Sequence, residues 1–307
     1  MEAVATGADR NDTGPMLDSH VHVWAHEPGT PTPTYDLLAS YCDAAETAGI
    51  QQIAITEHCT RFDRVLAEVE SHWDRPRSGP LADATDHILA MESGGDLDAY
   101  VNAIVDAQNR GLPIALGLEV DHLPGAAEAM DAVLADYPFD VFLGSVHWLD
   151  AWLFDAYENS AFAQEWERRD TAEVWQRYVD AVVDLAASGR IDILAHIDVI
   201  KVAGHRPERA EEIEDRLITG LAGSNVVIEV SSAGWRKPAG EIYPSPRLLE
   251  RLLAGGHRIT TASDAHQAGQ IGHRFDDLAH VLDEHGIDAL TAFHERRPVS
   301  VPRDSTQ

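Results

Sequence analysis

Seven short apolar runs alternate with segments of helical periodicity along most of the chain, and this alternation limits the fold to a small set. The predicted strands are 16–23, 51–56, 113–120, 139–146, 191–196, 225–231 and 258–263. The predicted helices are 36–48, 97–110, 126–135, 171–187, 207–222, 246–254 and 276–285. Repetition of strand, crossover helix and strand predicts a parallel sheet covered by helices.

An open doubly wound sheet and a closed barrel both satisfy this repetition. An open sheet usually carries a glycine-rich loop after its first strand, whereas this first strand continues as DSHVHVWAH, without glycine. The sequence therefore favours a barrel, and 307 residues suit a single one. We predict one domain over 1–307, with flexible ends at 1–15 and 300–307. Residues 61–93, which contain Trp, Pro and several charges, are predicted to form a loop or insertion over the barrel mouth.

The composition excludes several classes of partner. The formal net charge is -29, which argues against binding to nucleic acid or to an anionic membrane. It still permits a small phosphorylated substrate, because metal ions can supply local positive charge. The chain has no long uncharged apolar run and no basic, apolar leader, and its two cysteines are too few for a disulfide framework. We predict a cytoplasmic protein, and the oligomeric state stays open.

Six of the seven predicted strands end in residues of the types that bind divalent metals. The first ends in His20 and His22, and residues i and i+2 of a strand point to the same side. The other ends supply His58, Glu119, His147, His196, Asp264 and His266. The carboxyl ends of barrel strands meet at one face, where unpaired buried charges would be costly. A multi-metal site removes that cost, so the pattern favours a metal cluster over structural histidines.

Cationic residues follow the fifth and sixth predicted strands, where they could bind a phosphate group. They are Lys201, His205, Arg206, Arg236 and Lys237, and they include both lysines of the chain. Arginine suits phosphate oxygens because its guanidinium can bind them bidentately. Glu229 is predicted to lie near the site, as a ligand for a substrate ammonium, a proton-transfer group or a structural carboxylate. Asp18 and Asp198 are predicted to orient ligand histidines, or to be solvated loop carboxylates.

The strand ends also resemble a known family. The segments DSHVHVWAH, ITEH, GLEVDHLPGAAE, GSVHWLD, AHIDVIKVAGHRP, EVSSAGWRKPAGEIYPS and TASDAH occur in the order found in the PHP (polymerase and histidinol phosphatase) family, in its histidinol-phosphatase branch. The resemblance covers about residues 16–275. It implies a distorted (β/α)7 TIM-like barrel with a metal cluster at the C-terminal face of the strands.

The resemblance also implies a set of ligands for two to three divalent ions, which could be zinc, manganese or iron. The first ion would be held by His20, His22, Glu119 and Asp264. The second would be held by Glu119, His147 and His196, with Glu119 bridging. The third would be held by His26, His58 and His266, although His26 lies closer to the first histidine pair than is usual in the family. The catalytic residues would be Glu119, Asp264 and His266.

The predicted reaction is hydrolysis of L-histidinol phosphate to L-histidinol and phosphate, in histidine biosynthesis, by direct attack of metal-bound hydroxide. The chain has no DxDxT or CxxxxxR motif that would supply a covalent nucleophile. One alternative is a phosphoesterase of the same family that acts on another small phosphate or on nucleotides. A second is an amidohydrolase, which usually carries a metal-bridging lysine on its fourth strand. A non-enzymatic regulatory module is the least favoured, because the ligand set is complete.

Overall fold

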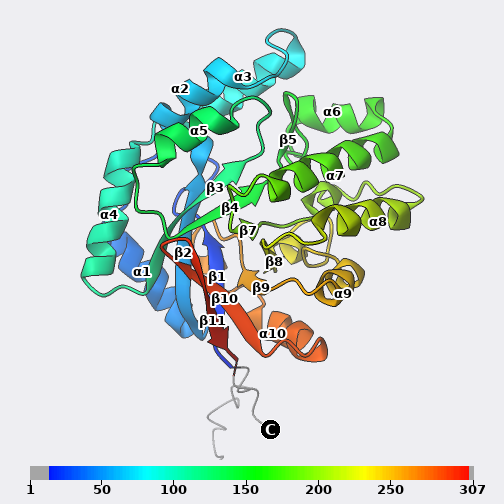
Figure 1. Cartoon of the computed structure of the whole chain (residues 1–307). Coiled ribbons are helices and arrows are strands. Elements are labelled where there is room, and N and C mark those ends of the chain that lie inside the picture. Colours follow the sequence, from blue (N-terminus) through cyan, green and yellow to red (C-terminus); the bar gives the residue numbers. More distant parts are fainter. Residues whose placement is uncertain (1–13, 304–307) are drawn as a thin grey trace, which may run out of the picture.

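The computed structural model describes residues 14–303, and at its centre seven parallel strands curve into a nearly closed barrel (Figure 1). The strands follow one another round the barrel in sequence order. They are β1 (Met16–Val21), β2 (Ile50–His58), β3 (Ile114–Asp121), β4 (Val141–Ser145), β7 (Ile193–Leu194), β8 (Val227–Ser231) and β9 (Ile259–Ala262). Each predicted strand overlaps one of these, so the predicted distorted (β/α)7 barrel is confirmed.

The barrel closes between its first and last strands by a short contact. A parallel bridge joins Val21 to Ala265, and the backbone N–H of His22 donates to the Ala265 carbonyl at 2.7 Å. This bridge lies at the carboxyl ends of β1 and β9. The closure therefore brings the histidine pair of β1 beside the Asp264–His266 segment.

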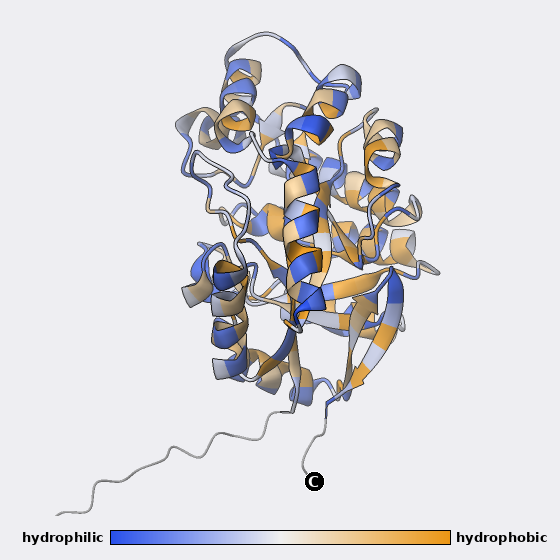
Figure 2. Cartoon of the chain, turned by 90° about the vertical axis from the view of Figure 1, so that its left-hand side faces the viewer, coloured by the Kyte–Doolittle hydropathy of each residue, from blue (hydrophilic) through white to orange (hydrophobic). Residues whose placement is uncertain are grey.

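Helices cover the outside of the barrel (Figure 1). Those that were predicted are α1 (Tyr35–Thr47), α4 (Leu97–Asn109), α5 (Ala127–Leu134), α7 (Thr171–Ala187), α8 (Ala210–Leu221), α9 (Pro246–Ala254) and α10 (Phe275–Glu284). Side-chain caps begin several of them: Thr34 accepts from the Leu37 N–H, and Asp170 from the Glu173 N–H. Their apolar faces pack inward, and Figure 2 shows largely hydrophobic strands inside helices of mixed polarity. Within residues 14–303, no helix is long and apolar enough to span a membrane.

Residues 61–93 are mainly helical, so of the two predicted alternatives they form an insertion and not a loop. They contain α2 (Asp63–His72) and α3 (Pro80–Glu92). The sequence also did not reveal α6 (Ser160–Arg168), nor the hairpin of β5 (Trp148–Leu149) and β6 (Trp152–Leu153). Short 3-10 helices are η1 (Cys59–Arg61), η2 (Val199–Lys201), η3 (Ala233–Arg236) and η4 (Ala268–Gln270). Residues of α3 and of the segment after β6 form walls of the cavity described below.

A C-terminal hairpin, β10 (Ala289–His294) and β11 (Arg297–Pro302), packs against the amino-terminal end of the barrel. Phe293 joins a buried cluster with Ala54, Val141 and other residues of the barrel interior. Because residues 300–302 pair within this hairpin, the prediction of a flexible end is wrong for them. The rest of the predicted flexible C-terminal end, at 304–307, lies outside the described residues. So does nearly all of the predicted flexible segment 1–15.

Candidate metal centre and active site

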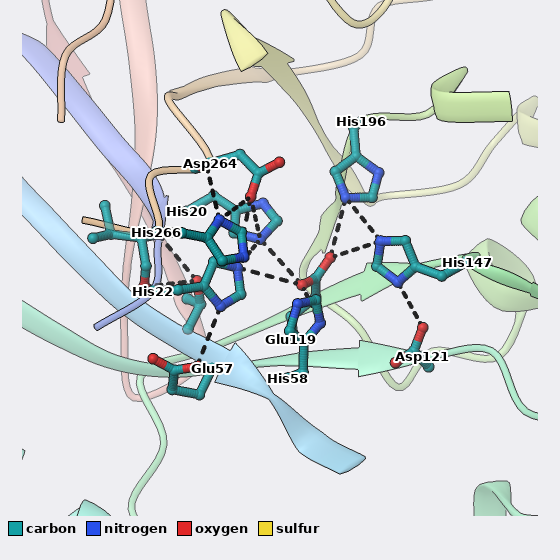
Figure 3. A network of polar contacts seen from close by, with 12 residues as sticks. His20, His22, Glu57, His58, Glu119, Asp121, His147, His196, Asp264 and His266 are labelled. Carbon is teal, nitrogen blue, oxygen red and sulfur yellow. Dashed lines mark hydrogen bonds and ion pairs between the residues drawn. The ribbon is translucent and has the colours of Figure 1, made fainter. Parts of the chain in front are cut away.

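The carboxyl ends of the barrel strands converge on a cavity of about 360 Å³. Eight ionisable side chains at these ends point toward one another (Figure 3). They are His20, His22, His58, Glu119, His147, His196, Asp264 and His266. Most are buried, and Glu119, His20 and His22 are at most 1% exposed. Such a concentration of ionisable groups needs charge compensation.

Glu119 lies at the centre of the cluster, and its two carboxylate oxygens face different imidazoles. Its Oε2 lies 2.8 Å from His58 Nδ1 and 3.3 Å from His20 Nε2. Its Oε1 lies 3.1 Å from His196 Nε2 and 3.5 Å from His147 Nε2. One carboxylate thus connects two groups of nitrogen donors, which is the geometry of a bridging ligand.

Four sets of three side chains bring donor atoms within 4.8 Å of one another. These sets are His20, His22 and Asp264; His20, Glu119 and His196; His58, Glu119 and His147; and His22, His58 and His266. The first set lies within the first predicted ligand group, whereas the second and third combine residues from different predicted groups around Glu119. In the last set His22 stands where the sequence predicted His26.

His26 lies at the edge of the cluster and belongs to none of the four sets, so its role as a ligand stays a prediction. Its side chain is 54% exposed, and its Nδ1 lies 3.1 Å from a carboxylate oxygen of Glu92. The Nη2 of Arg61 is also 3.1 Å from that nitrogen. His26 follows the strand in a loop, where strand alternation no longer fixes the direction of a side chain, and its ring stacks on that of His266.

Unpaired nitrogens show that these side chains fit a divalent metal. The Nε2 atoms of His58 and His266 are buried and have no hydrogen-bond partner among the described residues. The Nε2 atoms of His20 and His22 face each other at 3.0 Å, where at most one proton can lie between them. Buried polar atoms in folded proteins are normally paired. Cations bound by histidine and carboxylate donors, as zinc is, would pair these atoms.

The backbone is strained at two of these residues. His196 has φ 21° and Asp264 has φ 52°, values that side chains with a Cβ rarely adopt. Surrounding contacts hold both conformations: the His196 N–H donates to Glu229 Oε1 at 3.1 Å, and Arg236 donates to the Asp264 carbonyl at 2.9 Å. Such strain is frequent at functional sites.

Three carboxylates orient the ligand imidazoles from behind. Asp121 lies 2.7 Å from His147 Nδ1, and Glu229 lies 2.9 Å from His20 Nδ1. A more distant contact of 3.4 Å joins Glu57 to the Nδ1 of His22. An ionised carboxylate only accepts hydrogen bonds, so each Nδ1 carries the proton and each Nε2 is free to bind a cation.

The sequence suggested other roles for Glu229, Asp18 and Asp198. Glu229 is fully buried and uses its oxygens for His20 and the His196 backbone, so its predicted contact with substrate is corrected. Asp18 does not orient a histidine, because it accepts from the N–H and hydroxyl of Ser263. Asp198 also has another role, described below.

The charges in the site favour an ionised Glu119 with positive charge on the groups around it. Burial alone would raise the pKa of Glu119, but His20, His58 and His147 outweigh it and hold that pKa well below its usual range. Burial likewise lowers the pKa of His147, but Glu119, Asp121 and Asp155 outweigh it and raise that pKa to about 10. The carboxylates therefore draw positive charge to this imidazole, as a proton or as a metal ion.

Three of the predicted phosphate ligands lie away from the cavity. Lys201 is fully buried, and its Nζ contacts Asp198 Oδ2 at 2.7 Å and Glu241 Oε1 at 2.9 Å. Arg206 pairs with the same Glu241 at 2.7 Å. His205 stacks on Trp166, with 4.5 Å between ring centroids. The predictions for Lys201, His205 and Arg206 are therefore corrected, because internal partners neutralise the two cations and an aromatic ring holds the third residue.

Arg236 and Lys237 remain near the metal-ligand cluster. The Nη2 of Arg236 donates to the carbonyls of Ser263 and Asp264 at 2.7 and 2.9 Å. Its Nη1 is buried and has no hydrogen-bond partner in residues 14–303. Lys237 is exposed and lines the cavity.

A parallel α/β barrel with a buried cluster of histidines around a central carboxylate, at the carboxyl ends of its strands, defines the class of barrel metallohydrolases. Residues 34–233 match the PHP domain, and a relative from Deinococcus radiodurans is 30% identical over 284 residues, covering 92% of this chain and 98% of the relative. The chain therefore belongs to the PHP domain family.

The relatives and structural neighbours carry related names. The Deinococcus radiodurans relative is named a probable histidinol-phosphatase, and a Bacillus subtilis histidinol-phosphatase is 24% identical, covering 84% of this chain and 96% of the relative. A Lactococcus lactis histidinol phosphate phosphatase, solved with zinc, L-histidinol and phosphate, superposes with a TM-score of 0.67 at 18% identity, covering 92% of this chain and 98% of that one. A putative histidinol phosphatase from Listeria monocytogenes has a TM-score of 0.66 at 17% identity, covering 85% and 99%. These neighbours show the same fold.

Proposed function

We propose that the protein is a metal-dependent histidinol-phosphatase that hydrolyses L-histidinol phosphate to L-histidinol and phosphate in histidine biosynthesis. The observation that carries the proposal is the position of Glu119, whose two oxygens face separate groups of imidazoles beside a cavity of about 360 Å³. The names of the relatives support this substrate. The free thiols of Cys42 and Cys59 suit the cytoplasmic location that we propose.

We propose two to three divalent cations per chain, of zinc, manganese or iron. The first would be held by His20, His22, Glu119 and Asp264, and the second by Glu119, His147 and His196. A third would be held by His26, His58 and His266. His22 belongs to donor sets for both the first and the third cation. Since one imidazole nitrogen binds one cation, competition for His22 would decide whether the third position fills.

When bound, such cations lower the pKa of a coordinated water and stabilise charge on phosphoryl oxygens. The protein holds the ligands in place: Glu119 stays ionised between the two groups, and Asp121 and Glu229 keep Nε2 of their histidines facing inward. Asp264 and His266 line the cavity, and we assign them with Glu119 to the catalytic centre. The free Nη1 of Arg236 and the ammonium of Lys237 would bind phosphate oxygens.

An amidohydrolase activity is less well supported by the same residues. That class usually has a lysine between its metal ions, whereas here Glu119 lies between the donor groups. Lys201 is buried beside Asp198 and Glu241, and Lys237 is exposed at the cavity wall. Neither lysine contacts the central histidines.

A panel of phosphate esters, assayed with purified protein and defined metals, tests the proposal. We expect L-histidinol phosphate to have the highest kcat/KM. Preference for another small phosphate or a nucleotide would keep the phosphoesterase chemistry and reject the substrate. Absence of phosphate release under every metal would reject both.

A further inference from the structure

Two polar atoms in the cavity wall have no protein partner. Asp155 lies in the segment between β6 and α6, and Tyr243 precedes α9; both line the cavity. The Oδ1 of Asp155 and the hydroxyl of Tyr243 are buried and have no hydrogen-bond partner among the described residues. Tyr243 is only 1% exposed. Because a buried, unpaired polar group destabilises a protein, these two atoms indicate a ligand that completes their hydrogen bonds.

Asp155 differs from two other carboxylates of this wall, Glu92 and Asp121. Glu92 is paired with Arg61 at 3.3 Å, and Asp121 is paired with His147 at 2.7 Å. The nearest ionisable nitrogen to Asp155 is that of His147, which lies 4.0 Å from its Oδ2, too far for a hydrogen bond. Asp155 also belongs to none of the four donor sets for a metal. Its carboxylate is therefore available to a bound molecule.

The chemistry of the two groups selects the ligand. A carboxylate repels a phosphate, and it accepts hydrogen bonds from a cation that has several donors, such as an ammonium group. Tyr243 lines the same cavity, and the pKa of its hydroxyl is raised by burial and further by acidic groups that include Asp155. Apolar and aromatic side chains that suit a carbon skeleton line the same cavity, among them Leu89, Trp148 and Tyr157.

We infer that Asp155 and Tyr243 form a subsite for a primary ammonium group of the substrate. The enzyme would then select phosphomonoesters of amino alcohols, with the phosphate at the metal ligands and the ammonium at Asp155. Glu158, exposed at the cavity wall, adds negative charge to the approach. This subsite rests on the proposed phosphatase function and assigns its specificity to named residues.

Two substrates that differ only in the ammonium group test the subsite: L-histidinol phosphate and 3-(imidazol-4-yl)propyl phosphate. Asp155→Asn should lower kcat/KM for the first by about ten- to a hundred-fold, mainly through KM, which is the loss expected of one charged hydrogen bond. The second substrate and the metal content should be unaffected. Tyr243→Phe, which keeps the packing, should give a smaller loss on the first substrate only.

Asp150→Asn is the matched control, because Asp150 lies on the β5–β6 hairpin but pairs with Arg177 at 2.8 Å and does not line the cavity. It should change neither substrate. Wild-type protein that hydrolyses both substrates equally would overturn the subsite alone. Loss of metal, or an equal loss on both substrates, in Asp155→Asn would also overturn it and leave the phosphatase standing. Wild-type protein that hydrolyses neither would contradict the proposed function and the subsite together.

Discussion

His20 and Glu229 lie 209 residues apart in the chain, yet the Nδ1 of His20 is 2.9 Å from the Oε2 of Glu229, and both side chains are fully buried. Glu229 thereby fixes the tautomer of an imidazole in two of the donor sets. Glu229→Gln should weaken metal affinity by about ten- to a hundred-fold, as is typical when an orienting partner of a ligand is removed. Competition with a chromophoric chelator measures this. Unchanged affinity in a folded variant would show that Glu229 does not orient His20.

Arg236 and Arg206 should differ in their effects on turnover, although both follow barrel strands. The Nη1 of Arg236 is free beside Asp264, whereas Arg206 is paired with Glu241. Arg236→Ala should lower kcat/KM for L-histidinol phosphate by about ten- to a hundred-fold with metal content intact. Arg206→Ala serves as the control and should leave kcat/KM nearly unchanged. Equal losses in the two variants would argue against a phosphate contact by Arg236.

The buried Lys201 predicts a pH-dependent contribution to stability. Burial raises the pKa of Glu241, but hydrogen bonds from Lys201 and Arg206 outweigh it and lower that pKa below its usual value. The ionised form is therefore the stabilising one, and its contribution is lost as the pH falls through the lowered folded-state pKa. Glu241→Gln should reduce the free energy of unfolding by about 1–3 kcal/mol at neutral pH. Urea unfolding at several pH values should show this difference shrinking in acid, and a pH-independent difference would contradict the assignment.

The C-terminal hairpin should stabilise the barrel without taking part in catalysis. Phe293 packs with residues of the barrel interior, and Asp140, just before β4, accepts from the Glu295 N–H at 3.0 Å. Phe293→Ala should lower the free energy of unfolding by about 3–5 kcal/mol. Denaturant unfolding measures that loss, and kcat/KM of the folded variant should stay near wild type. A selective loss of activity at full stability would contradict this separation.

Much of the barrel could be predicted because each strand and each covering helix has its own periodicity. The insertion at 61–93 was harder, because α2 buries only Val65 and Val69 and α3 only Ala82, Thr85 and Leu89. Such short apolar stripes do not separate a helix from a loop by pattern alone. The hairpin β10–β11 was missed because its second strand is almost wholly exposed and contains two prolines.

The candidate ligands could be predicted because parallel strands bring their carboxyl ends to one face, whatever their separation in sequence. Ion pairs between side chains of different loops could not be predicted. The position of Lys201 after a strand suggested a phosphate contact, but Asp198, three residues earlier, and Glu241 neutralise it. Asp121, two residues after Glu119 on the same strand face, was a signal for the cluster that sequence reasoning did not use. The free hydroxyl of Tyr243 carried no sequence signal.

Metal removal and return, followed by hydrolysis of L-histidinol phosphate, test the central claim most directly. Exhaustive chelation should abolish phosphate release, and titration with zinc, manganese or iron should restore it with an end point of two to three ions per chain, in line with the four overlapping donor sets. Elemental analysis of the same samples gives the stoichiometry. Full activity in protein that holds only trace metal, or no phosphate release from protein that holds two to three ions, would contradict a metal-dependent histidinol-phosphatase.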